Sequence, residues 1–137
     1  IFRGTGQTFS SFRNQNFTER DFNIIKIGLE LPREEIYDRI NQRVDLMMEQ
    51  GLLDEVKSLN NRKHLNSLQT VGYRELFDYF DGKIDLDFAV EEIKKNSRRF
   101  AKRQLTWYRK DERVNWFSPF QKEDILKFLQ QQIKNLD

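Results

Sequence analysis

The sequence contains no cysteine, one histidine and two prolines in 137 residues. Without cysteine there is no disulfide framework, no thiolate zinc site and no cysteine nucleophile, and His64 alone cannot complete a histidine metal site. We therefore expect no metal chemistry from this chain by itself. The lack of cysteine also fits a reducing, cytoplasmic location.

Long hydrophobic runs are missing as well, and the mean hydropathy of −0.82 is too low for a membrane span. The length suits one domain, and 12 Phe, 4 Tyr and 2 Trp can build a core, which argues against wholesale disorder. The chain begins at Ile1, with neither the apolar run of a signal peptide nor the Arg-rich pattern of a transit peptide. We interpret this start as a cut through a longer protein.

The chain divides into an irregular, polar lead-in over residues 1–21 and a single helical region over residues 22–137. Alternating apolar residues over 22–31 predict a strand with one buried side. It is the only strand that the sequence predicts. A lone strand cannot satisfy its backbone groups, so we expect its sheet partner in absent sequence or in another chain.

Most of the remaining sequence has helical periodicity. Pro32 followed by Glu34 and Glu35 predicts a helix start, because proline fits the first turn and acidic residues suit the positive end of the helix dipole. The fold class is mostly α, with one core strand near residues 22–31. The expected helices cover residues 32–50, 52–59, 73–80, 86–110 and 123–136, and a polar loop covers residues 60–69.

Positive charge is concentrated in one segment. The formal net charge is only +2, but residues 94–113 carry nine Lys or Arg against two acidic residues, a net +7, and the remainder is −5. On the helix expected over 86–110 these side chains form a basic ridge. The ridge consists of Lys95, Arg99, Lys102, Thr106, Arg109 and Arg113. The opposite side, expected to pack, carries Ile93, Phe100, Gln104, Trp107 and Tyr108.

Such a ridge can be an ordinary solvated helix face. Here acidic partners at i,i+4 are almost absent over four turns, so the positive charge is left uncompensated and points to an external anion. One helical turn rises about 5.4 Å, which is comparable with phosphate repeats in nucleic acid. We favour nucleic acid over a membrane because the opposite face is expected to pack into a core.

Three blocks, in this order and spacing, resemble the tRNA dimethylallyltransferase (tRNA isopentenyltransferase) family. They are LPREEIYDRINQRVDLMMEQGLLDEV at 31–56, TVGYRE at 70–75 and SRRFAKRQLTWYRK at 97–110. The segment TGQTFS at 5–10 is also similar to the family. The resemblance covers the chain as the C-terminal part of a longer enzyme, completing a P-loop-like α/β core.

The resemblance implies transfer of a dimethylallyl group from dimethylallyl diphosphate to N6 of the adenosine next to the anticodon. It also implies that the P-loop, the Mg²⁺ site, the general base and an inserted helical domain belong to a missing N-terminal half. No G-x-x-x-x-G-K-[ST] loop occurs in this sequence. We therefore expect no catalytic residue in the chain, and partners in that half, in dimethylallyl diphosphate and in the tRNA anticodon stem-loop.

The resemblance assigns one diphosphate-binding residue, Arg43, in the stretch R-I-N-Q-R. From its spacing, Arg43 lies at the edge of the apolar face of its helix, where a guanidinium can reach a cleft and hold two phosphate oxygens. Without the resemblance it reads as a solvated arginine. Arg39, one turn earlier, is expected to pair with Glu35.

The resemblance also assigns two tRNA-contacting stretches. Tyr73 and Trp107 can stack on an unstacked base, and the cations can meet phosphates. Alternatively, both rings are core aromatics. Gln104 is expected to be buried and to need hydrogen-bond partners, and His64 is expected to be an exposed bystander. The two stretches are Gln69, Thr70, Val71, Gly72, Tyr73 and Arg74, and Lys102, Arg103, Gln104, Leu105, Thr106, Trp107, Tyr108 and Arg109.

Two other functions remain open at this point. One is a non-catalytic helical RNA-binding module. The other is a helical interaction domain whose basic helix meets an acidic protein.

Overall fold

The computed structural model describes residues 4, 6, 8 and 22–135. The expected lead-in therefore lies mostly outside the described residues, as do most of the TGQTFS segment and the last residue of the expected C-terminal helix. In chain order the elements are β1 (Lys26–Leu29), α3 (Arg33–Glu49), α4 (Leu52–Ser58), the 3-10 turns η1 (Asn60–Arg62) and η2 (Asn66–Leu68), α5 (Tyr73–Phe80), α6 (Leu86–Tyr108), β2 (Val114–Phe117) and α7 (Lys122–Lys134).

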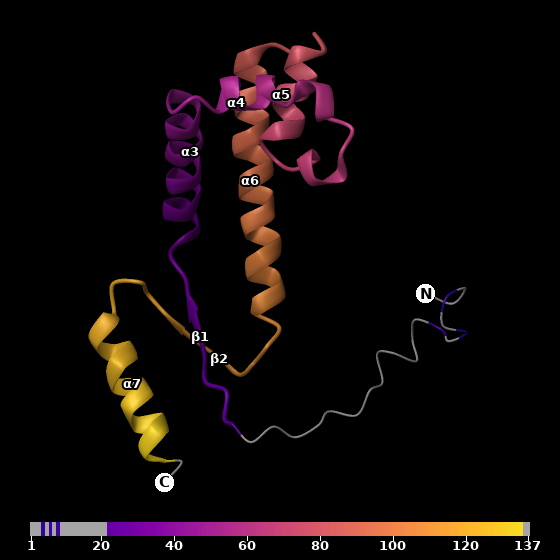
Figure 1. Cartoon of the computed structure of the whole chain (residues 1–137). Coiled ribbons are helices and arrows are strands. Elements are labelled where there is room, and N and C mark those ends of the chain that lie inside the picture. Colours follow the sequence, from indigo (N-terminus) through magenta and orange to yellow (C-terminus); the bar gives the residue numbers. More distant parts are fainter. Residues whose placement is uncertain (1–3, 5, 7, 9–21, 136–137) are drawn as a thin grey trace.

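The described part is mostly helical, as the sequence predicts, and the expected helices agree with the observed ones to within two residues. Helices α3 to α6 form one unit, in which α3 and α5 pack against the long helix α6 and α4 packs against α3 and α5 (Figure 1). This unit contains the hydrophobic core of the described part. Its buried apolar side chains are Val44, Leu52, Val56, Leu76, Phe77, Ala89 and Ile93.

Polar side chains fix α3 against α6. Lys94 of α6 pairs with Asp45 of α3 at 2.8 Å, and the hydrogen bond to Asp45 raises the pKa of Lys94. One turn further along, Arg98 Nη1 donates to Asn41 Oδ1 at 2.6 Å. These two contacts set the spacing of the helices just beyond the buried core.

The expected strand forms only over Lys26–Leu29, and none of its residues is buried. The prediction about its partner is wrong. β1 pairs in parallel with β2 of the same chain, with Gly28 opposite Trp116. A side chain at position 28 would come within 2.8 Å of both Trp116 and Val114, so glycine is what allows this close approach. The two-stranded sheet lies beyond the C-terminal end of α6, at the opposite end of this helix from the core (Figure 1).

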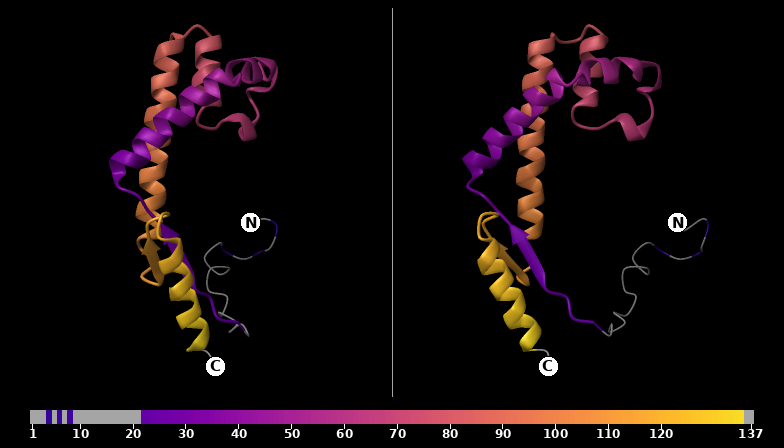
Figure 2. Two further views of the ribbon diagram at one scale, coloured as in Figure 1. Left: turned by 90° about the vertical axis from the view of Figure 1, so that its left-hand side faces the viewer. Right: turned by 60° about the vertical axis from the view of Figure 1, so that its left-hand side comes forward.

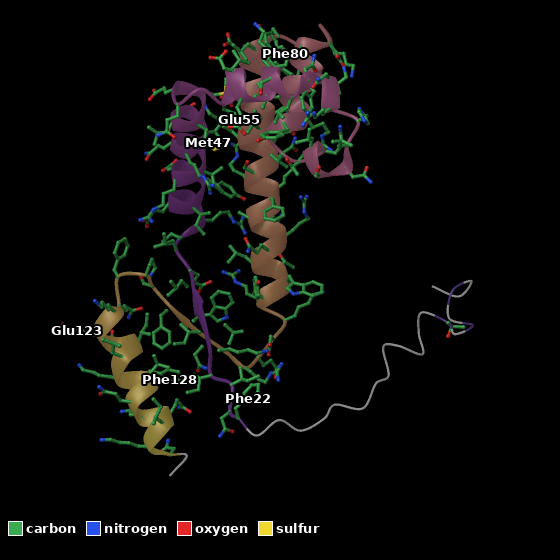
Figure 3. All side chains as sticks on the ribbon, viewed as in Figure 1. Phe22, Met47, Glu55, Phe80, Glu123 and Phe128 are labelled. Carbon is green, nitrogen blue, oxygen red and sulfur yellow. The ribbon has the colours of Figure 1, made fainter. Side chains whose placement is uncertain are left out.

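α7 packs along the sheet in both views of Figure 2. The contact is aromatic: the rings of Phe117 on β2 and Phe128 on α7 are 5.5 Å apart, and Figure 3 shows Phe128 directed from α7 toward the strands. The turn before α7 also reaches α3, because the Arg39 guanidinium lies 5.8 Å from the Phe120 ring centroid. Arg39 pairs with Glu35 at 2.7 Å, as expected.

The second half of α6 differs from the sequence expectation. Phe100, Trp107 and Tyr108 are 57%, 73% and 50% exposed, and Gln104 is exposed. The predicted packing face is therefore real only up to Ile93, and the prediction of a buried Gln104 is wrong. None of the helices in the described part combines the length and the hydropathy that crossing a bilayer requires.

Candidate functional site

A groove of about 550 Å³ lies between α3, the loop before α5 and the middle of α6. Arg43 contributes from α3, Thr70 and Gly72 from the loop, and Ser97 and Gln104 from α6. Residues from all three family-like blocks thus meet in one place. Apolar side chains complete the lining: Ile40, Val44, Met47, Val71, Ile93 and Phe100.

Arg43 provides the positive charge of this groove. Its position on α3 next to buried Val44 agrees with the sequence expectation that it borders the apolar face and reaches a cleft. Its side chain is exposed and has no ion pair within the described part of the chain. A guanidinium in this setting can take two oxygens of a phosphate or diphosphate in a bidentate contact.

The loop wall of the groove depends on Gly72. Its φ of +100° is a conformation that residues with a side chain rarely adopt. The Gly72 N–H donates to Glu75 Oε2 at 2.8 Å, so Glu75 caps the start of α5. In the sequence GYRE, Glu75 thus has a structural role as a helix cap, whereas the family resemblance assigns a role only to Gly72, Tyr73 and Arg74.

The neighbours of Gly72 in the predicted tRNA-contacting stretch have structural partners. Gln69 Nε2 donates to the Lys63 carbonyl. The Tyr73 hydroxyl donates to the Glu55 carboxylate, and this bond raises the pKa of Tyr73. The Tyr73 ring meets Phe77 edge-on at 6.3 Å. For Tyr73 the packing therefore favours the alternative of a core aromatic.

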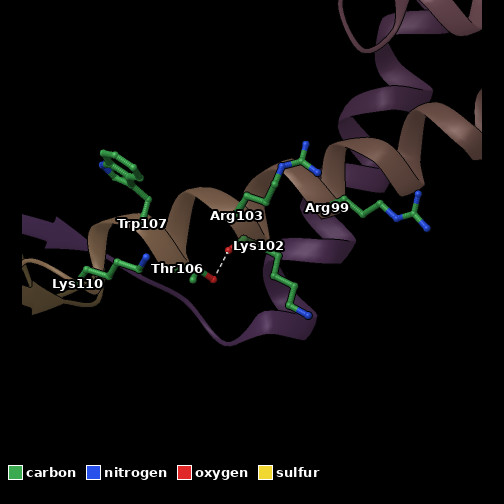
Figure 4. A pocket seen from close by; sticks show the side chains of 6 residues that line it. All are labelled: Arg99, Lys102, Arg103, Thr106, Trp107 and Lys110. Carbon is green, nitrogen blue, oxygen red and sulfur yellow. Dashed lines mark hydrogen bonds between the residues drawn. The ribbon is translucent and has the colours of Figure 1, made fainter. Parts of the chain in front are cut away.

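A second surface lies on the outer side of α6, and we call it the outer basic patch. It is a shallow hollow of about 380 Å³ lined by Arg99, Lys102, Arg103, Thr106, Trp107 and Lys110 (Figure 4). Thr106 Oγ1 donates to the Lys102 carbonyl at 2.8 Å, whereas Trp107 stands free in solvent at 73% exposed. An exposed aromatic ring among cationic side chains suits contacts to a base and to phosphates.

The predicted basic ridge is only partly uncompensated. Lys95 pairs with Glu92, Arg109 with Glu30 at 2.7 Å, and Arg113, which lies beyond α6, with Asp111 at 2.9 Å. The sequence argument considered partners at i,i+4 and missed those at i,i+3 and in the tertiary structure. Within the described residues, the four cations of the outer basic patch have no ion pair: Arg99, Lys102, Arg103 and Lys110. Arg98 of α6 has none either, but it donates to Asn41.

Six of the assigned site residues line neither surface: Gln69, Tyr73, Arg74, Leu105, Tyr108 and Arg109. Leu105 and Tyr108 line a hollow of about 630 Å³ beside the sheet, together with Gly28 and Trp116. His64 is exposed in the loop before α5, as expected. The groove and the outer basic patch therefore contain nine of the assigned residues: Arg43, Thr70, Val71, Gly72, Lys102, Arg103, Gln104, Thr106 and Trp107.

Sequence reasoning missed Ser97, Phe100 and Glu75. Ser97 and Phe100 lie on the same face of the helix as Gln104, at helical spacing. The sequence pattern therefore groups them with Gln104, but the face predicted from that pattern is a packing face and not a groove wall. Glu75 three residues after Gly72 is the acidic half of a capping-box pattern. In the described part of the chain, no group of three or more His, Cys, Asp or Glu side chains could hold a metal ion.

Comparison with known sequences returns one consistent family. The IPPT model, described as IPP transferase, matches residues 1–111. tRNA dimethylallyltransferase 1 of Bacteroides thetaiotaomicron is 57% identical over 128 residues, which are 93% of this chain and 42% of that protein. tRNA dimethylallyltransferase of Christiangramia forsetii is 62% identical over 113 residues, covering 82% of this chain and 37% of that protein.

Solved structures agree with the sequence comparison. The full-length tRNA isopentenylpyrophosphate transferase of Bacillus halodurans matches 86% of this chain and 42% of its own, with a TM-score of 0.77 and 43% identity. The tRNA delta(2)-isopentenylpyrophosphate transferase of Staphylococcus epidermidis matches 99% of this chain and 46% of its own, with a TM-score of 0.75 and 36% identity. The chain thus spans less than half the length of each of these relatives.

Proposed function

Because this chain belongs to the IPP transferase family, whose model matches residues 1–111, we propose that it is the C-terminal part of a tRNA-modifying prenyltransferase. The complete enzyme would transfer a dimethylallyl group from dimethylallyl diphosphate to N6 of the adenosine next to the anticodon. This chain would supply one wall of the reaction channel and part of the tRNA-binding surface.

The observation that carries this proposal is the convergence of three separate segments on one groove. Arg43, Thr70 to Gly72 and Gln104 line it together, and the outer basic patch lies on the same helix α6. A diphosphate at Arg43 and an RNA along α6 would thus be held by one rigid element and its neighbours, which supports a shared site for both substrates.

The proposed prenyl transfer requires specific contributions from these side chains. The bond between the dimethylallyl carbon and the diphosphate oxygen breaks, a bond from adenine N6 to that carbon forms, and N6 loses a proton to a base. Arg43 would neutralise the charge that grows on the leaving diphosphate. The target base must leave its stack to react, and the exposed Phe100, Gln104 and Trp107 would offer it stacking and hydrogen-bonding surfaces.

The remaining parts of the reaction belong, in this proposal, to the rest of a complete enzyme. The described residues offer no cluster that fits Mg²⁺, so we assign the Mg²⁺ site, the P-loop and the general base to the N-terminal half. A tRNA substrate supports a cytoplasmic location for the complete enzyme.

A chimera tests the proposal. The matching part of the Bacteroides thetaiotaomicron relative is replaced by this chain, and mass spectrometry of tRNA measures N6-dimethylallyladenosine. We expect the chimera to form this product. A folded chimera that binds tRNA but makes no product would favour the non-catalytic RNA-binding alternative, and one that binds an acidic protein but no tRNA would favour the interaction domain.

A further inference from the structure

Glu75 is the one buried charged side chain in the described part of the chain, with 5% exposed. Its Oε2 accepts the Gly72 N–H at 2.8 Å, and its Oε1 accepts Asn96 Nδ2 at 2.8 Å. The Arg74 guanidinium is 3.5 Å from Oε1. Both carboxylate oxygens are therefore fully engaged, although Glu75 does not line the groove.

The two donors belong to two different walls of the groove. Gly72 ends the loop wall, and Asn96 directly precedes Ser97 on the α6 wall. Glu75 thus joins these walls from behind the lining. This bridge links the Thr70 to Gly72 backbone to α6 in addition to the packing of α5 on α6.

Gly72 is buried, and its φ of +100° with ψ of −52° is an unusual backbone conformation. Apart from its chain neighbours, no atom lies within 4 Å of where a Cβ would stand, so no side chain is packed against that side of the residue. The hydrogen bond from the Gly72 N–H to Glu75 is the directional contact that favours this conformation. Burying a carboxylate is unfavourable unless it is fully hydrogen-bonded. Capping of α5 does not require a buried carboxylate, so it does not by itself explain why Glu75 is buried.

We propose that Glu75, through Asn96, is a positioning residue that keeps the Thr70 to Gly72 backbone in register with Ser97 and Gln104 on α6. It makes no contact with substrate. Its role is to hold the loop wall where an RNA base and Arg43 can be engaged together. This inference rests on the proposed function, because it assigns the bridge a purpose in that same groove.

Exchange of donor and acceptor tests the bridge. Asn96→Asp places two carboxylates face to face and breaks the bridge, while Asn96→Ala removes only the donor on α6. In the double variant Glu75→Gln with Asn96→Asp, the Gln amide N–H donates to Asp and its oxygen accepts the Gly72 N–H, so the bridge is restored with its polarity reversed. Asp85→Ala is the matched control, since Asp85 accepts the Phe88 N–H at 2.7 Å at the start of α6, outside the groove.

The measurements are the affinity of the chain for an anticodon stem-loop RNA and hydrogen exchange of amides 70–72. We expect Asn96→Asp and Asn96→Ala to bind at least about ten-fold more weakly and to exchange these amides faster, with unchanged helix content by circular dichroism. The double variant should recover most of the affinity. Asp85→Ala should lower the melting temperature and leave affinity unchanged.

Three results would overturn the inference. Unchanged affinity and exchange in both Asn96 variants would show that the loop holds itself, and an equal loss of affinity in Asp85→Ala would show a general stability effect. If the double variant recovered neither the RNA affinity nor the slow exchange of amides 70–72, the bridge would be excluded as the cause of the losses in the Asn96 variants. Failure of the unaltered chain to bind the RNA would instead overturn the proposed function, and the purpose given to the bridge with it.

Discussion

At the scale of single residues, Arg43 combines exposure with a fixed position in the groove. Because its guanidinium has no ion pair in the described part and Ala is a good helix former, we expect Arg43→Ala to change the free energy of unfolding by less than about 1 kcal/mol. In the chimeric enzyme it should lower kcat/KM by about 10²-fold or more, since a charge-assisted contact to the leaving diphosphate is lost. Urea unfolding of the chain and steady-state kinetics of the chimera measure the two effects.

Two further variants sharpen this prediction. Arg43→Lys should rescue only part of the rate, because an ammonium group cannot form the bidentate contact. Arg39→Ala, one turn away on α3 and paired with Glu35, should leave the kinetics near normal. A large drop in stability of Arg43→Ala with normal kinetics would make Arg43 a structural residue.

The sequence predicted these residues unevenly. Arg43 and Gly72 could be assigned through the family resemblance of the short blocks around them, and helical spacing added that Arg43 borders the apolar face of its helix. Gln104 was expected inside because periodicity shows which residues share a face but not what covers that face. Glu75 was missed because its second partner, Asn96, is 21 positions away, and such a contact exists only once α5 has packed against α6.

At the scale of elements, the two halves of α6 have different roles, one in packing and one in presenting a charged surface. Its first half packs through Ala89 and Ile93, and its second half carries the outer basic patch on a rigid rod beyond the core (Figure 1). The helix was predicted to within two residues, because a periodic pattern over 23 residues leaves little ambiguity.

The outer basic patch makes a quantitative prediction for salt. If Arg99 and Lys102 neutralise phosphates, the slope of log K for tRNA binding against log[salt] should become shallower by about 0.7 to 0.9 for each one replaced by Ala. Lys95→Ala, whose charge is already paired with Glu92, should change the slope much less. Titrations at several salt concentrations measure this, and an equal change for Lys95 would reduce the patch to general surface charge.

The strand pair was the element that the sequence predicted least well. Val114–Phe117 is only four residues long and follows a highly charged segment, so its alternation is too short to stand out. Each residue of its partner β1 lies 88 positions earlier, as Lys26 does relative to Val114, and parallel pairing of such distant segments depends on the chain between them. Side chains next to the strands support the pairing, since Lys26 of β1 forms an ion pair with Asp111 just before β2.

The stabilising effect of the ion pairs of Asp111 should depend on pH. Hydrogen bonds from Arg113 and then Lys26 hold the pKa of Asp111 well below its ordinary value. A depressed pKa in the folded state stabilises the fold above the unfolded-state pKa of about 3.9 and loses this contribution as the pH falls toward the folded-state pKa. We therefore expect Asp111→Asn to melt below the unaltered chain at pH 7 and this gap to narrow by pH 3. Glu112→Gln, at a neighbouring exposed position without an ion pair in the described part, should show no such narrowing.

At the scale of the whole molecule, the described part has a well-packed end and a sparsely packed one. The buried core lies entirely among α3 to α6, whereas Leu29 on β1 is 55% exposed, as are many apolar side chains on the rest of α6 and on α7. Apolar surface of this extent is typical of an interface. It agrees with a chain that spans less than half the length of its relatives, and the prediction that a missing half completes the channel remains to be tested.

Separation of binding from chemistry is the prediction that belongs to this scale. The 137-residue chain has the outer basic patch and Arg43, so we expect it to bind tRNA in a salt-dependent way. It should form no N6-dimethylallyladenosine when incubated with dimethylallyl diphosphate, Mg²⁺ and unmodified tRNA, because Arg43 can stabilise a leaving group but cannot accept the N6 proton. Mass spectrometry of the tRNA measures the product, with the chimera as positive control. Turnover by the purified chain would mean that a general base lies within these residues and that the division of the reaction between two halves is wrong.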